Sequence, residues 1–518
     1  MLKVLLATGR KAEGMVKEAI RRVNFVKCDV LTQDIGIAAF STPQSLKRAL
    51  EKHFISKISD YDLILLSGLC KADFSALEKE IATPIRLGPK HAFDLGDTLQ
   101  FAEELQFSSH LPADVFLAEQ RRENAKQQLY ELEGSVKEKF SIKGVKIGGG
   151  ARMKVCAEIV DATRLSERKL QQKMKYFLES GADLIDIGVH VGAKPEEVKK
   201  AVKAASAFAP EVPISVDTLD AELILAGIDT GVDMVLSVNK ENMVKVGDEI
   251  GGKDIVAVVI PDFDARGDSK SLFENIKRTK EYGINHIIAD PVLNAVGYGI
   301  AESLYNYYRF RLQDKSTPLF FGVGNVTELL DADSVGINAT LAGIASELNA
   351  DILFTPEYSD KAIGSVRELR IASEMMTLAK ARKSAPKDLG LDLLILKEKR
   401  KKPIMQLRDK DKKLIVAKED EKWRLDPKGC FKIGICEMES KSKSEGDREK
   451  RIYAEHSPTG KRIVGKSAKG IMDTILRLDM VSLLKHASYL SMKLTKAELA
   501  LRLNRSYEQD ETVFSFLL

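Results

Sequence analysis

The stretch Ile287-Ile288-Ala289-Asp290-Pro291 decides the fold that we expect, because an apolar run ends abruptly in an acid and a proline. No polar residue interrupts Ile287 to Ala289, which predicts a buried strand. Pro291 ends the strand, since proline has no N–H to give to a sheet ladder. Asp290 then stands at the strand's carboxyl end, where its charge is available to a ligand.

The same pattern of an apolar run with a polar tip recurs at several points of the central region. It is found in Ile185-Asp186-Ile187-Gly188, Ile214-Ser215-Val216-Asp217-Thr218 and Met234-Val235-Leu236-Ser237-Val238-Asn239. Eight strand–helix units can be traced between about residues 150 and 384, which predicts a central (β/α)₈ TIM barrel. The polar strand ends of such a barrel converge on one mouth. The candidates there are Asp161, Thr163, Asp186, His190, Asp217, Asn239, Asp262, Asp290, Asn325 and Glu357. Any one of them alone is more often a turn residue or a helix cap.

The regions on either side of this barrel have patterns of their own. Residues 1–148 alternate apolar strands with helices and predict a small parallel α/β domain, with a polar connecting helix over 118–139. That domain has no glycine-rich nucleotide-binding motif. Residues 385–518 begin with a basic stretch and end in two amphipathic helices over 471–503, which predicts an α+β module of unassigned role. We therefore expect three domains, at 1–148, 150–384 and 385–518.

Composition excludes several classes of protein. The formal net charge is only +4 in a chain of 518 residues, so the balance gives no reason to expect a nucleic-acid partner. Five cysteines without a CxxC pair indicate free thiols in a reducing, cytoplasmic setting. The apolar run at the N-terminus is too short for a signal peptide, and no stretch approaches the length of a membrane helix.

Four motifs carry a resemblance to a known family. Ile159-Val160-Asp161-Ala162-Thr163, the segment from Ser180 to Gly188, Ser215-Val216-Asp217-Thr218 and Ala289-Asp290-Pro291 resemble successive motifs of the pterin-binding superfamily. This superfamily contains dihydropteroate synthase and the methyltetrahydrofolate–corrinoid methyltransferases. The three-part layout is most similar to that of the archaeal dihydropteroate synthase-related proteins.

The resemblance implies a pterin site. Asp290 matches the aspartate that grips the pterin ring, where a carboxylate accepts from N3–H and the 2-amino group together. Asp217 matches an aspartate on the far edge of the pterin, and Asn239 lies near the family's strand-4 asparagine. Asp161 stands where the synthase has an asparagine beside pyrophosphate, so it is our candidate ligand for Mg²⁺ and a candidate catalytic residue.

The departures from the synthase pattern matter as well. Gly322-Val323-Gly324-Asn325 replaces the synthase's Ser-Arg-Lys and resembles the methyltransferase segment whose asparagine reaches pterin N5. Asn325 is therefore both a pterin-binding and a catalytic candidate. The strand-8 end offers no arginine. Lys194, Arg266 or Lys361 would have to supply the missing cation, although each is more often a solvated loop charge. His190 is a candidate general acid or base, or else a polar loop residue.

Three functions remain open at this point. The first is a transferase of the dihydropteroate synthase type, which joins a dihydropterin methyl carbon to an arylamine with loss of pyrophosphate, in folate or methanopterin biosynthesis. The second is a methyltransferase that passes the methyl group of a reduced pterin to an external acceptor. The third is a non-catalytic pterin carrier or assembly subunit. The oligomeric state is undetermined, with a homodimer as one candidate.

Overall fold

The computed structural model describes residues 2–514 except for 22, 54, 101, 104–106, 263–268, 388, 400–414, 419–421, 423 and 440–447. The chain divides into two compact units, residues 1–401 and 402–518. Each unit is described by itself below. None of the described helices is long and apolar enough to cross a membrane.

The N-terminal part of the first unit is a four-stranded parallel sheet with the order β2-β1-β3-β4. Its strands are β1 (Lys3–Gly9), β2 (Lys27–Gln33), β3 (Leu63–Leu66) and β4 (Ile85–Leu87). Its helices are α1 (Glu13–Ile20), α2 (Pro43–His53), α3 (Ser75–Ile81) and α4 (Leu95–Gln100). Alternate residues of β1 enter two separate apolar clusters, Leu5 in one and Val4 and Leu6 in the other. Both faces of this sheet are therefore buried, as a parallel sheet requires.

A long helix and a hairpin connect this sheet to the barrel. Helix α5 (Ala113–Ser135) packs through Ala125 against Leu378 and Ala379 of the last barrel helix. The hairpin of β5 (Phe140–Ile142) and β6 (Val145–Ile147) follows. Its apolar side chains belong to the same cluster as the inner side chains of the barrel, so the hairpin closes the barrel's amino-terminal end.

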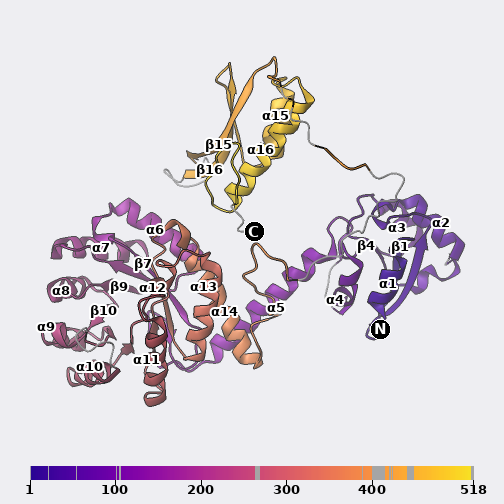
Figure 1. Cartoon of the computed structure of the whole chain (residues 1–518). Coiled ribbons are helices and arrows are strands. Elements are labelled where there is room, and N and C mark those ends of the chain that lie inside the picture. The colour runs from indigo at the N-terminus through magenta and orange to yellow at the C-terminus, as the bar shows by residue number, and fades with distance from the viewer. Residues whose placement is uncertain are drawn as a thin grey trace. The chain divides into compact units, whose positions relative to one another are not determined.

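The central part is a closed barrel of eight parallel strands. The strands are β7 (Lys154–Ile159), β8 (Leu184–Gly188), β9 (Ile214–Asp217), β10 (Met234–Val238), β11 (Val256–Val259), β12 (Ile287–Ala289), β13 (Phe320–Phe321) and β14 (Ile352–Thr355). Neighbouring strands pair from β12 through β7 to β14 and β13, and a bridge between Ala289 and Leu319 closes the ring. Figure 1 shows the helices outside the strands. They are α6 (Glu167–Ser180), α7 (Pro195–Phe208), α8 (Ala221–Thr230), α9 (Lys240–Gly252), α10 (Ser269–Glu281), α11 (Ile300–Gln313), α12 (Gly324–Thr327), α13 (Ser334–Glu347) and α14 (Ser365–Arg382).

Alternation along each strand sorts the barrel's side chains into two cores. Val155, Ala157 and Ile159 of β7 face outward into the cluster shared with the helices. Cys156 faces inward and joins an inner cluster with Leu184 and its counterparts on the other strands. The next inward position on β7 after Cys156 is Glu158, so the inner lining changes from apolar to acidic toward the carboxyl ends.

The second unit is an antiparallel sheet covered by two helices. The order is β15-β16-β17, with β15 (Cys430–Glu439), β16 (Arg448–Ser457) and β17 (Arg462–Gly465). Helices α15 (Ala468–Arg477) and α16 (Leu484–Arg502) pack on it around Ile471, Ile475 and Leu494. The predicted fold class, a TIM barrel with a small parallel α/β part before it and an α+β module after it, is confirmed. The three domain boundaries stay predictions.

Candidate functional site

Most of the polar strand ends that the sequence singled out lie at the carboxyl ends of the barrel strands. Asp290 follows β12, Asp217 ends β9, and Asn239 follows β10. Because the ring is closed, these ends share one rim, which we call the mouth. The residue roles predicted from the sequence stay predictions; what the structure adds is the environment of each side chain.

Asp290 is held by two donors on one of its oxygens. The hydroxyl of Tyr307 donates to Oδ1 over 2.6 Å, and the N–H of Val292 donates to the same atom over 2.8 Å. Within the described part of the chain, Oδ2 is therefore the oxygen left for a ligand. Burial raises the pKa of the Asp290 carboxyl to about 6, against the lowering effect of these two hydrogen bonds.

Asp217 lies at the same end of the barrel as Asp290, since each stands at the carboxyl end of its strand. Burial and, to a smaller extent, the charge of Asp290 together raise the pKa of its carboxyl to about 7. Acids from β9 and β12, 73 positions apart in the chain, thus meet at one mouth.

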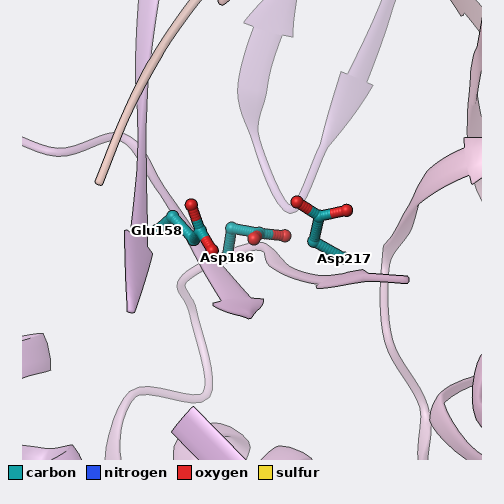
Figure 2. A group of neighbouring side chains, drawn as sticks. All are labelled: Glu158, Asp186 and Asp217. Carbon is teal, nitrogen blue, oxygen red and sulfur yellow. The ribbon is translucent and has the colours of Figure 1, made fainter. Parts of the chain in front are cut away.

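A third and a fourth acid lie beside Asp217, inside the barrel rather than on its rim. Glu158 pairs in register with Asp186 across β7 and β8, and Asp217 stands opposite Gly188 on β9. One carboxylate oxygen from each of the three acids lies within 4.8 Å of the others. Figure 2 shows the Asp186 side chain between those of Glu158 and Asp217. We call these three residues the acid cluster.

Sequence reasoning found two members of the acid cluster and missed Glu158. We expected a buried strand that ends at Asp161, and this expectation gave no role to Glu158 inside the strand. The available signal was the period of two: Glu158 has the same inward direction as Cys156, and an acid pointing into a barrel has no solvent to face.

Gly188 makes room for this acid. A Cβ on Gly188 would overlap Glu158 Oε1 and would also contact the backbone of Ile159 and Val160. A side chain at this inward position would displace the Glu158 carboxylate. The backbone of Gly188 is that of an ordinary strand, so any residue could adopt it. What matters here is the small size of glycine, which leaves space for the Glu158 carboxylate.

Electrostatics in the acid cluster favour the neutral acids. Burial raises the pKa of Glu158 to about 8, and the charges of Asp217 and Asp161 add to this. Burial also raises the pKa of Asp186 well above its ordinary value, followed by the charges of Asp217 and Glu158. The positive charge of Lys173 lowers the pKa of Glu158, but its effect is smaller than those of burial and of the neighbouring acids. The acids of the cluster therefore hold protons more readily than exposed acids do, and they can ionise at neutral pH only where another positive charge takes the place of the protons.

Asp161 and His190 lie in the loops above the first two strands. Asp161 has a left-handed backbone with φ of 51° and precedes a 3₁₀ turn, Ala162–Arg164. Its carboxylate forms an ion pair of 3.2 Å with Arg164, and both side chains are about half exposed. His190 is buried, and its Nδ1 lies 2.6 Å from the hydroxyl of Thr163. These two loops are thus tied together by the Thr163–His190 hydrogen bond.

The two asparagines have structural contacts that orient them. Asn239 is the N-cap of α9, and its Oδ1 accepts from the N–H groups of Glu241 and Asn242. Its carbonyl oxygen is therefore engaged with the helix. Asn325, at the start of α12, donates from Nδ2 to the carbonyl of Leu293 over 2.8 Å. This bond attaches Asn325 to the loop that begins at Asp290.

Two further acids at strand ends hold loops in place. Glu357 accepts from the hydroxyl of Tyr176 and from the N–H of Val366. Asp262 accepts from the side chain of Asn275 and the N–H of Lys240. Both acids therefore have structural contacts, because their hydrogen bonds go to backbone groups and to neighbouring helices.

The cations considered as substitutes for the synthase's arginine and lysine have different positions. Lys361 forms an ion pair of 2.6 Å with Asp331. Lys194 is exposed and precedes α7. Arg266 and the loop over 263–268 lie outside the described residues. A cavity of about 760 Å³ is lined by Gly148–Gly150, Thr317 and Asp351. Because these residues precede barrel strands, the cavity lies at the amino-terminal end of the barrel and is separate from the mouth.

Comparisons with known proteins place this geometry in a family. Residues 159–326 match the profile of the pterin binding enzyme family, and residues 425–510 match a profile named PterinBD-DUF4346. Uncharacterized protein MJ0107 of Methanocaldococcus jannaschii is 37% identical, and the alignment covers 99% of each chain. The chain belongs to the same family as this protein, within the pterin-binding superfamily.

Further comparisons match only parts of the chain. The acetyl-CoA decarbonylase/synthase complex subunit gamma 2 of Methanosarcina thermophila is 26% identical over 39% of this chain, and the alignment spans only 43% of that subunit. Dihydropteroate synthase of Xanthomonas albilineans with 4-aminobenzoic acid is 21% identical, with 46% of this chain and 95% of that chain covered and a TM-score of 0.37. Dihydropteroate synthase of Coxiella burnetii in complex with pteroic acid is 18% identical, with 45% and 95% covered and a TM-score of 0.38.

Proposed function

We propose that the barrel mouth binds a reduced pterin between Asp290 and Asp217. The observation that carries this is the state of Asp290: Tyr307 and Val292 fix Oδ1, which leaves Oδ2 to receive the donors on the ring edge. A pterin edge offers N3–H and the 2-amino group side by side, which suits a fixed carboxylate. Membership of the pterin-binding superfamily supports the ligand class.

The reaction that we propose is a synthase-type transfer. The nitrogen of an arylamine attacks the methylene carbon of a dihydropterin pyrophosphate, the C–N bond forms as the C–O bond breaks, and pyrophosphate leaves. The amine loses one proton, and His190, which is held by Thr163, is our candidate to receive it. The role of the barrel is to position both partners and exclude water from the reacting carbon.

The acidic mouth has a consequence for this reaction. Glu158, Asp186 and Asp217 would repel pyrophosphate unless positive charge offsets them. A bound Mg²⁺ supplies such charge and suits carboxylate oxygens. Asp161, the predicted ligand, is engaged with Arg164, whereas the acid cluster offers three converging oxygens, so the donor chemistry of the chain fits a hard cation.

The test is a pyrophosphate-release assay with 6-hydroxymethyl-dihydropterin pyrophosphate, 4-aminobenzoate and Mg²⁺. Release that requires the arylamine supports the synthase, and Asp290→Asn should lower it. Pterin binding measured by calorimetry without any release, over a panel of arylamines, would leave the binding proposal in place and refute the reaction.

A second candidate is methyl transfer from a methylated reduced pterin, which one observation favours. Asn325 donates to the carbonyl of Leu293 in the loop that begins at Asp290, which supports a position for Asn325 near the same ligand. An asparagine beside pterin N5 can stabilise the ring as the methyl group leaves. Loss of the methyl group only when a corrinoid or thiol acceptor is added would support this candidate over the synthase.

A further inference from the structure

Asp186 is a fully buried acid inside the barrel, and one of its oxygens has no hydrogen-bond partner in the described part of the chain. The residue is 0% exposed. Its Oδ1 accepts from the hydroxyl of Ser215, whereas Oδ2 is buried without any hydrogen bond in the described part of the chain. A buried acceptor left without a donor costs about 1–3 kcal/mol, so native proteins rarely keep one without a reason.

The orphaned oxygen belongs to a carboxylate that lies between two others. Glu158 is its register partner on β7, and Asp217 is one strand away on β9. Figure 2 shows the three carboxylates side by side, with that of Asp186 in the middle. Three acids in a shared, mostly dry space repel one another when ionised, and the described residues place no cation in hydrogen-bonded contact with them.

We propose that the acid cluster, Glu158, Asp186 and Asp217, binds a divalent cation of the hard, oxygen-preferring class. One ligand atom from each residue lies within 4.8 Å of the others, so some point between them lies within about 2.8 Å of all three, which is 4.8 Å divided by √3. Magnesium and calcium bind oxygen at about 2.0–2.6 Å. Each carboxylate therefore needs to move by less than about 1 Å.

The cation would satisfy the features that the acid cluster otherwise leaves unexplained. It would give Asp186 Oδ2 a partner and neutralise the mutual repulsion of the three acids. It also accounts for Gly188, whose missing side chain is the space that Glu158 occupies. Three protein ligands leave positions for water or a ligand oxygen, which is how Mg²⁺ is commonly held.

This assignment differs from the sequence-based one. Asp161 is about half exposed and paired with Arg164 at 3.2 Å, and it contributes no atom to the group of converging oxygens. Asp217 has two carboxylate oxygens, so one can bind the cation while the other faces the pterin. The cation site does not depend on which reaction the barrel performs.

The experiment is a titration of the full-length, EDTA-treated protein with Mn²⁺ in the absence of pterin, followed by electron paramagnetic resonance of free Mn²⁺. We expect one tight site per chain, and Mg²⁺ should compete for it. Glu158→Gln and Asp186→Asn should each weaken Mn²⁺ binding at least tenfold, because each replaces an anionic ligand by a neutral one. Asp161→Asn is the matched control and should change the dissociation constant less than threefold.

Several results would overturn the proposal. They are the absence of a tight Mn²⁺ site in the wild-type protein, an affinity that Glu158→Gln leaves unchanged, or a loss that follows Asp161→Asn alone. Circular dichroism checks that each variant is folded, and Glu158→Gln alone carries the test if Asp186→Asn does not fold. Pterin calorimetry on the same samples separates this proposal from the proposed function, since Glu158→Gln should retain pterin binding even when Mn²⁺ binding is lost.

Discussion

Replacing Asp290 by asparagine tests the pterin site at its best-defined group. In the wild-type protein, Tyr307 and Val292 both donate to Oδ1. An asparagine side chain keeps those two bonds by presenting its carbonyl oxygen to the same donors. Its NH₂ group then occupies the place of Oδ2, so a donor faces the donors of the pterin edge.

The magnitude follows from the hydrogen bonds that the ligand loses. A hydrogen bond to a charged group contributes about 1.5–3 kcal/mol, and each 1.4 kcal/mol is a factor of about ten in affinity. Losing one such bond should raise the dissociation constant about 10- to 100-fold. Losing the bonds from both pterin N3–H and the 2-amino group should raise it further. Isothermal titration calorimetry with a dihydropterin measures this directly.

A matched variant separates the carboxylate from its support. Tyr307→Phe removes one donor to Oδ1 but leaves the charge of Asp290, so it should weaken pterin binding less than Asp290→Asn does. Both variants should be folded, as judged by circular dichroism. A dissociation constant of Asp290→Asn within twofold of the wild-type value would refute the role of Asp290 and with it the proposed orientation of the ring.

Two further predictions concern stability. Gly188→Ala should lower the free energy of unfolding by about 1–3 kcal/mol, because the new methyl group overlaps Glu158 in a closely packed barrel; urea unfolding measures it, and an unchanged midpoint would contradict the packing. Burial raises the pKa of Asp351 to about 6, so this carboxyl keeps its proton to higher pH in the folded than in the unfolded chain, and its contribution to stability falls as the pH rises through that value. Between pH 5 and pH 7.5 the wild-type protein should therefore lose about 1 kcal/mol more than Asp351→Asn, whose amide oxygen can still accept from the N–H of Leu319; parallel pH profiles of the two proteins would contradict this.

The barrel could be predicted from the sequence because its strands are apolar runs that end in a polar residue, a glycine or a proline. Asp290 and Asp217 could be placed at the mouth because strand ends converge in any closed parallel barrel. Asn239 shows where such reasoning stops: its side chain caps α9, a helix that the sequence pattern did not reveal, although Asn242 three positions later is a capping signal.

Glu158 could not be found from its own neighbours alone. Its position in the site depends on the register of β7 against β8, and on the absence of a side chain at Gly188, which is a property of two segments 30 positions apart. The hairpin over 140–147 was missed for a similar reason, since its apolar residues become meaningful only where they meet the inner side chains of the barrel.

The hairpin of β5 and β6 closes the amino-terminal end of the barrel, so an ion that reaches the acid cluster has to enter at the mouth. A cation bound beside Asp186 therefore has to pass the mouth before a pterin binds there. Under the two proposals, the cation would bind before the pterin and dissociate after it. Cation exchange would be slow while a pterin occupies the mouth.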